Sequence, residues 1–72
     1  MSEKDIVAFL SDDDVVFYVD NKLSSVCPLS KVIVTFGEVR NSFSSMEEAI
    51  HFKMFDGKSI LDLWDIIYPQ IS

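Results

Sequence analysis

The chain has 72 residues, 49% of them hydrophobic, and its six basic and twelve acidic side chains give a formal net charge of -6. The apolar content argues against disorder, and the length predicts one domain over residues 1–72, with a thin core that buries only about 60% of the unfolded surface. Surfaces that bind nucleic acid or anionic membrane are basic, and Arg40 is the only arginine. The composition therefore argues against both as partners. It favours a basic protein as partner, although modest acidity also serves solubility alone.

Cysteine content and the N-terminus bear on the compartment. Cys27 is the only cysteine, and a lone cysteine is typical of a reducing environment. The apolar run from Ile6 to Leu10 is too short for the core of a signal peptide or for a membrane span. We therefore expect a cytoplasmic protein.

The first ten residues are predicted to hold a short helix. Ser2 is suited to cap it, and Asp5 follows at the spacing that favours a helix N-terminus. Because the apolar run is short, a strand is the alternative. The run Asp12–Asp14 then predicts a solvated turn. A calcium loop needs acids at alternate positions and a later glycine, so we expect no metal here.

Three segments are predicted to form an antiparallel sheet, at about 15–19, 23–27 and 31–36. The first segment is β-branched or aromatic throughout, which is typical of a strand. Because it is apolar on both faces, we expect it to be the central strand. Asp20 and Asn21 supply the turn that follows it, and short connections between successive strands predict a meander.

The sheet is expected to end with the third segment. Pro28 closes the second strand, because proline cannot donate to a ladder. Gly37 marks a bulge or turn, and residues 38–43 are expected to be extended or looped.

The C-terminal part predicts a helical hairpin, with helices at about 45–55 and 59–68. Ser45 and Glu48 have the spacing of a capping box. Asp56-Gly57 is expected to end the first helix, and Ser59 is expected to cap the second. With this hairpin covering one face of the sheet, the fold class is α+β.

Gly57-Lys58-Ser59 matches only the end of a phosphate-binding loop. That motif needs an earlier glycine, where this chain has Phe52, and it follows a strand rather than a helix. We therefore expect no nucleotide and no other cofactor.

Catalytic chemistry has little support in the residue types. His51 is the only histidine, and it is flanked by apolar residues in a predicted helix. No lysine, arginine or histidine adjoins Cys27 to lower its thiol pKa, and the two residues together are too few to hold zinc. We expect a protein that is not an enzyme.

The last helix has an unusually wide apolar surface. At about 100° per residue, its apolar side chains cover an arc of about 220°, whereas a surface helix needs a stripe of roughly 100° or somewhat more. Such a helix is either enclosed by the core or offers a second apolar face to another molecule.

This arc leads to the functional hypothesis of a small acidic protein-interaction module, such as an inhibitor, immunity or regulatory protein, whose partner presents a basic or apolar surface. The partner-binding residues we expect are Trp64, Tyr68 and Ile71 as anchors, with Asp62 and Asp65 as rim charges. Two alternatives stay open. Trp64 can instead be the central core residue, which is the stronger expectation for it. The apolar face can also be buried in a homodimer.

Overall fold

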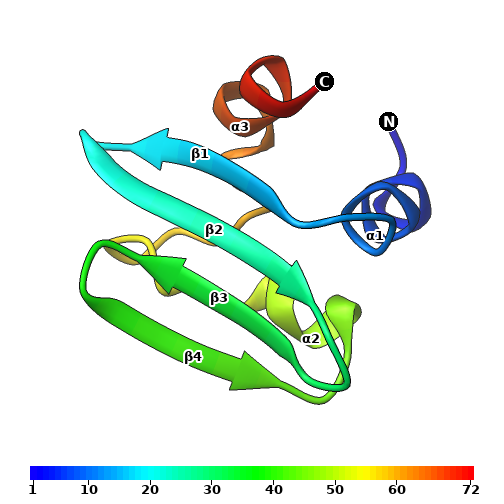
Figure 1. The fold of residues 1–72 in the computed structure, drawn as a ribbon. Coiled ribbons are helices and arrows are strands. Elements are labelled where there is room, and N and C mark those ends of the chain that lie inside the picture. Colours follow the sequence, from blue (N-terminus) through cyan, green and yellow to red (C-terminus); the bar gives the residue numbers. More distant parts are fainter.

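The computed structural model describes residues 1–72 and shows an α+β domain with a four-stranded antiparallel sheet (Figure 1). In chain order the elements are α1 (Glu3–Leu10), β1 (Val15–Val19), β2 (Lys22–Pro28), β3 (Val32–Phe36), β4 (Val39–Phe43), α2 (Met46–His51) and α3 (Trp64–Ile71). The strands follow one another in the order β1-β2-β3-β4. The predicted meander and the N-terminal helix are confirmed.

The sheet has one strand more than predicted, because β4 pairs along its whole length with β3. Gly37 has a φ of +60° in the connection between Phe36 and Val39, which pair with each other. The sequence of β4, VRNSF, has no strong apolar alternation, so its strand character comes from pairing with β3 and was not visible in its own residues.

β1 lies at the edge of the sheet, so the prediction of a central position was wrong. The apolar side chains on its two faces have different surroundings. Phe17 and Val19 are buried in the core, whereas Val16 and Tyr18 are exposed. α3 packs along β1, and this contact takes the place of a second strand neighbour.

The core lies between the sheet and the elements on one of its faces. Figure 1 shows the helices and the connection from α2 to α3 behind or beside the sheet, while the face toward the viewer is uncovered. Seventeen buried hydrophobic residues form one cluster. At its centre, Phe55 packs against the rings of Phe36 and Phe17, with centroids 4.9 and 6.3 Å away.

The predicted helical hairpin is absent, because α2 ends at His51 and α3 begins only at Trp64. Phe52 takes an extended conformation, which directs the chain beneath the sheet and lets Phe55 enter the core. Asp56 and Gly57, with φ of +54° and +83°, form a tight turn rather than a helix end. Backbone hydrogen bonds between Phe55 and Lys58 close this turn in both directions.

α3 is also displaced from the predicted range of 59–68. Ser59 is not the cap of this helix as predicted, because Leu63 is at its N-cap. Instead, the Ser59 hydroxyl accepts from the Asp62 N–H and the Asp62 carboxylate accepts from the Ser59 N–H, which gives a reciprocal pair of hydrogen bonds. This pair stabilises a turn that precedes the helix. At its other end the helix continues through Pro69 to Ile71. Pro69 lacks an N–H, but Asp65, whose carbonyl loses that donor, is exposed to water.

Candidate protein-binding surface

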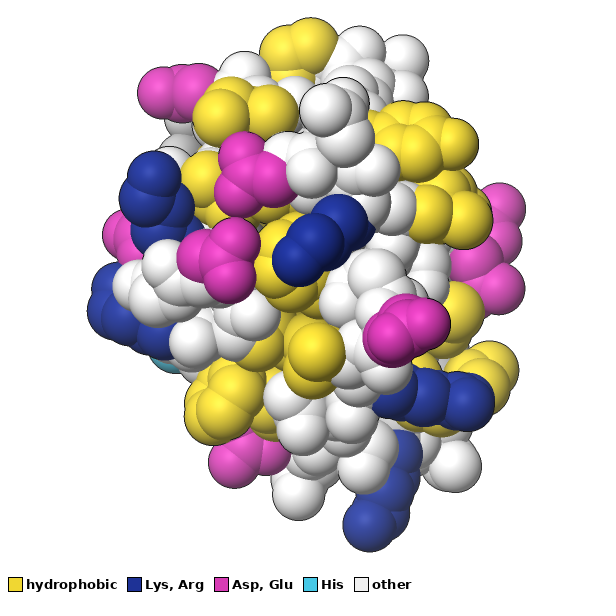
Figure 2. Space-filling view, turned by 90° about the vertical axis from the view of Figure 1, so that its left-hand side faces the viewer, with side chains coloured by type: hydrophobic (Ala, Val, Ile, Leu, Met, Phe, Trp, Pro, Cys, Tyr) yellow, Lys and Arg dark blue, Asp and Glu magenta, His cyan; other side chains and the backbone are white.

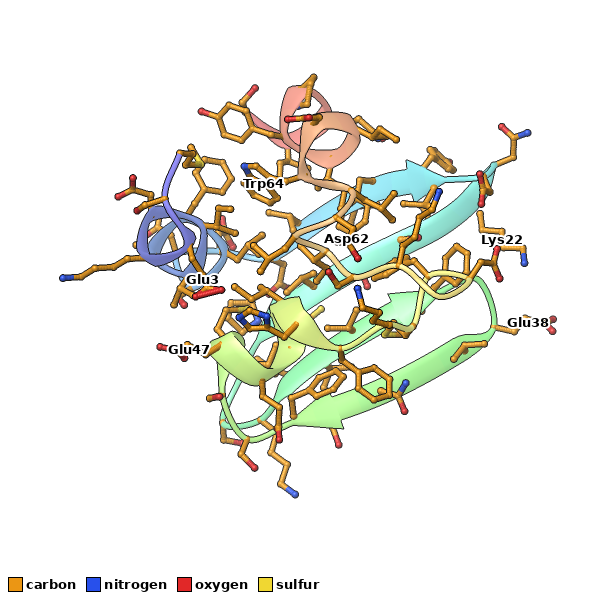
Figure 3. The ribbon with its side chains drawn as sticks, turned by 180° about the vertical axis from the view of Figure 1, so that it is seen from behind. Glu3, Lys22, Glu38, Glu47, Asp62 and Trp64 are labelled. Atoms are coloured by element: carbon orange, nitrogen blue, oxygen red, sulfur yellow. The ribbon has the colours of Figure 1, made fainter.

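Trp64 belongs to the core. Its ring lies between α1 and α3 (Figure 3), where it meets Phe9 edge-on at 6.1 Å and Tyr68 at 5.5 Å between ring centroids. The indole N–H points to the sulfur of Met1 at 3.3 Å. Tyr68 also packs on Phe9 and stays half-buried. Trp64 and Tyr68, the two predicted aromatic anchors, therefore belong to an aromatic cluster with Phe9 that packs α1 against α3.

Asp62 is held by three groups of its own chain. Its carboxylate accepts from the Lys53 ammonium at 2.7 Å and from the Ser59 N–H at 2.9 Å, and its own N–H donates to the Ser59 hydroxyl at 3.2 Å. The hydrogen bond from Lys53, followed by those from Ser59, lowers the pKa of Asp62 from 3.8 to about 2. Asp62 thus fixes the turn before α3, and Lys53 already neutralises its charge.

The remaining predicted residues do not complete a common surface. Asp65 is exposed, and Ile71 is half-buried beside α1. The wide apolar arc is used mainly inside the protein, because Ile60, Leu63 and Ile67 are buried. Ile66 is the one large hydrophobic side chain of α3 that remains well exposed.

A different surface, the uncovered face of the sheet, carries the largest group of exposed apolar side chains. We call it the open face. Strand pairing places Val16, Ser25, Thr35 and Arg40 in one row across it, with Tyr18 opposite Leu23 on one side of this row and Cys27, Ile33 and Ser42 on the other. Val16, Tyr18 and Leu23 are each more than half exposed. Cys27 and Ile33 are half-buried. The solvent face of an antiparallel sheet is ordinarily polar, so this grouping is unusual.

The charges of the protein lie mostly away from the open face. Arg40 is the one charged side chain in its rows, and no carboxylate is among them. Acidic side chains occur instead at the ends of the strands, at Asp14, Asp20 and Glu38. Figure 2, which views the end with the β1–β2 and β3–β4 turns, shows hydrophobic side chains reaching the surface between charges of both signs. The apolar side chains of the open face thus lie on β1, β2 and β3, with Ser25, Thr35 and Arg40 in the central row between or beside them, and the acidic side chains lie at the ends of the strands.

Sequence reasoning missed these open-face residues, although a signal for them was present. β1 is apolar at every position, and a short meander covered by helices on one side leaves half of those side chains in solvent. An apolar residue at every position is typical of a central strand, whereas β1 is an edge strand. Such a pattern marks an exposed apolar face as well.

The groups that could support chemistry are scattered or paired with one another. The Nε2 atom of His51 contacts the Glu3 carboxylate, and both side chains are largely exposed. Asp5, Asp12, Asp13 and Asp14 border a shallow hollow between α1 and α3. Asp5 also completes the cap of α1, and the hydrogen bonds from Ser2 lower its pKa. No group of three or more histidine, cysteine or acidic side chains is arranged to hold a metal ion.

Comparisons with protein-family models, with curated proteins and with solved structures find no match to this chain. None of its helices has the length and hydrophobicity needed to cross a membrane.

Proposed function

We propose that this protein is a small protein-binding module, of the kind that inhibits or regulates a partner by covering part of its surface, and that it binds through the open face. The observation that carries the proposal is the group of Val16, Tyr18, Leu23, Cys27 and Ile33 on the solvent side of the sheet, with no carboxylate among them. Contiguous exposed apolar patches of this kind are typical of interaction sites.

The acidic side chains at the border of the open face indicate the charge expected on the partner's surface. Interfaces commonly combine an apolar centre with a polar rim. Asp14, Asp20 and Glu38 supply acidic positions at the strand ends that border the apolar side chains of the open face, and the chain as a whole carries a net charge of -6. A partner with an apolar surface bordered by basic side chains fits both features, and its opposite potential would speed the encounter.

The surface first predicted on α3 supports binding less well. Trp64 and Ile67 are used within the core, and Asp62 is neutralised by Lys53. The alternative of a homodimer assumed that the apolar arc of α3 is available for self-association. Because most of this arc is buried within the protein, the structure no longer supports that alternative. The open face has no such internal use.

A matched pair of variants tests the proposal. Leu23→Ser changes a side chain on the open face that is 54% exposed, and Ile66→Ser changes one on α3 that is 55% exposed. Tagged wild-type protein and both variants are used for affinity capture from the native host, after circular dichroism has shown that the variants fold. We expect wild type and Ile66→Ser to recover the same stoichiometric partner and Leu23→Ser to lose it.

Two results would contradict the proposal. If Leu23→Ser recovers the partner as well as the wild type does, the open face is not the binding surface. Recovery that is lost only with Ile66→Ser would assign binding to α3.

A further inference from the structure

The two edge strands of the sheet, β1 and β4, differ in how their outward backbone groups are bound. At β1, the side-chain amide of Gln70 accepts from the Tyr18 N–H at 2.8 Å and donates to the Tyr18 carbonyl at 3.0 Å. This amide therefore occupies the place of a neighbouring strand. β4 has no corresponding cover, and Figure 1 shows no element beyond it.

The unpaired backbone groups of β4 belong to Arg40 and Ser42. The Gly37 N–H donates to the Leu23 carbonyl across the β2–β3 pair, so alternate residues of β3, including Phe36 and Val34, direct their backbone groups toward β4. Val39 and Asn41 are their partners. It follows that Arg40 and Ser42 direct their N–H and C=O groups outward, where the chain provides no loop or side chain to bind them.

The open part of this edge is sharply limited at both ends. Before it lies the Gly37-Glu38 turn, and after it the Ser44 N–H donates to the Glu48 carboxylate at 3.0 Å. Only the backbone groups of Arg40 and Ser42 therefore remain for an added strand. Unpaired strand edges are templates for pairing with another chain.

We propose that the occupant of this edge is a second copy of the chain, with β4 antiparallel to β4 about a two-fold axis at Asn41. This register places Arg40 of each copy opposite Ser42 of the other and uses all the outward N–H and C=O groups of these residues. A shift in one direction brings the two Arg40 side chains face to face, which is unfavourable. A shift in the other direction requires the Ser44 N–H, which Glu48 already binds.

Exposed apolar side chains flank the two ends of β4 in a way that suits the same two-fold axis. Val39, 52% exposed, begins the strand, and it pairs with the buried Phe36, so it points to the helix side. Phe52, 48% exposed, packs on Phe43 at the other end of the strand, with ring centroids 5.3 Å apart. Antiparallel pairing brings Val39 of each copy to Phe43 and Phe52 of the other. This reciprocal match, which is the property of a two-fold interface, favours a second copy over an unrelated strand.

The dimer would form one continuous sheet of eight strands, four from each copy, and its open face would extend across both. An interface of one strand edge and a few side chains belongs to the small, transient class. We therefore expect association to depend on concentration.

Sedimentation of the full chain tests the proposal, with a matched pair of proline variants. Proline removes a strand N–H and is tolerated where that N–H faces solvent. Ser42→Pro removes an outward N–H from β4, and Val16→Pro removes one from β1. For wild type and Val16→Pro, we expect the mass to rise toward twice the monomer value between about 1 μM and about 1 mM, which covers weak interfaces. Ser42→Pro is expected to stay monomeric.

Circular dichroism shows whether the variants fold. If Ser42→Pro does not, Phe52→Lys, at an exposed position outside the sheet, replaces it and is expected to be monomeric. The proposal is overturned if the wild type stays monomeric throughout, if the folded β4 or Phe52 variant dimerises like the wild type, or if Val16→Pro alone prevents dimerisation. These measurements report self-association through the β4 edge and do not measure partner binding by the open face.

Discussion

Replacing Trp64 with alanine is expected to remove a large part of the stability of the protein. The side chain is 8% exposed and packs against the rings of Phe9 and Tyr68. Truncating a buried tryptophan to alanine costs about 3–5 kcal/mol, and aromatic pairs add about 0.5–1.5 kcal/mol each beyond area burial. A chain of this length has a total stability of only about 4–11 kcal/mol, so the loss amounts to at least about a quarter of the total and, at the lower end of this range, to all of it.

Urea unfolding followed by far-UV circular dichroism measures this loss and does not depend on tryptophan fluorescence. Ile66→Ala, at an exposed position of the same helix, serves as the control and should change the stability by no more than about 0.5 kcal/mol. If Trp64→Ala stays within about 1 kcal/mol of wild type, well below the cost of a core truncation, Trp64 is not a core residue and the partner-anchor hypothesis for it regains support.

Three further changes test local features. Because the pKa of Asp62 is about 2 in the folded protein and 3.8 ordinarily, its charged form stabilises the fold above about pH 4, and this contribution disappears as the pH falls toward 2. The melting temperature of Asp62→Asn should therefore fall less over this interval than that of the wild type, and parallel curves would contradict the assignment. Gly57→Ala should lower the free energy of unfolding in urea by about 1 kcal/mol, because the φ of +83° at this position is unfavourable for alanine. No neighbouring atom obstructs the added Cβ. An unchanged urea midpoint would show that the conformation of this turn is not constrained. Gln70→Ala should cost about 1 kcal/mol and speed amide exchange at Tyr18, whose N–H it leaves unbound, and unchanged exchange would mean that this bond is not formed in solution.

Local signals in the sequence were sufficient for several elements. Ser2 caps α1 as predicted, and the structure adds that Asp5 completes a capping box with it. Asp20 and Asn21 have the positive φ values expected of a tight hairpin turn. Such features depend on a few adjacent residues, whose side chains satisfy nearby backbone groups or tolerate the turn conformation.

The errors arose where distant contacts decide the local structure. The apolar character of residues 52–55 is compatible with a helix, but burial of Phe55 beneath the sheet favours an irregular path. β4 depends on β3 for its pairing. The edge position of β1 depends on α3, which supplies both packing and the amide of Gln70. None of these contacts can be read from residue spacing within one segment.

The candidate binding site shows the same limitation. A wide apolar arc on a helix does not distinguish a second binding face from two internal neighbours, and here β1 and α1 provide the neighbours. The apolar positions of β1 were equally visible, but their exposure depends on which face of the sheet the helices cover.

The most direct test of the proposed function is to map the binding surface by titrating the isotope-labelled protein with its purified partner and following the backbone amide signals by NMR. The proposed function predicts that the largest shift changes fall on β1, β2 and β3, at Val16, Tyr18, Leu23, Cys27 and Ile33, while α2 and the exposed side of α3 change little. Changes concentrated on α3 around Asp65 and Ile66, with the open face unaffected, would contradict it.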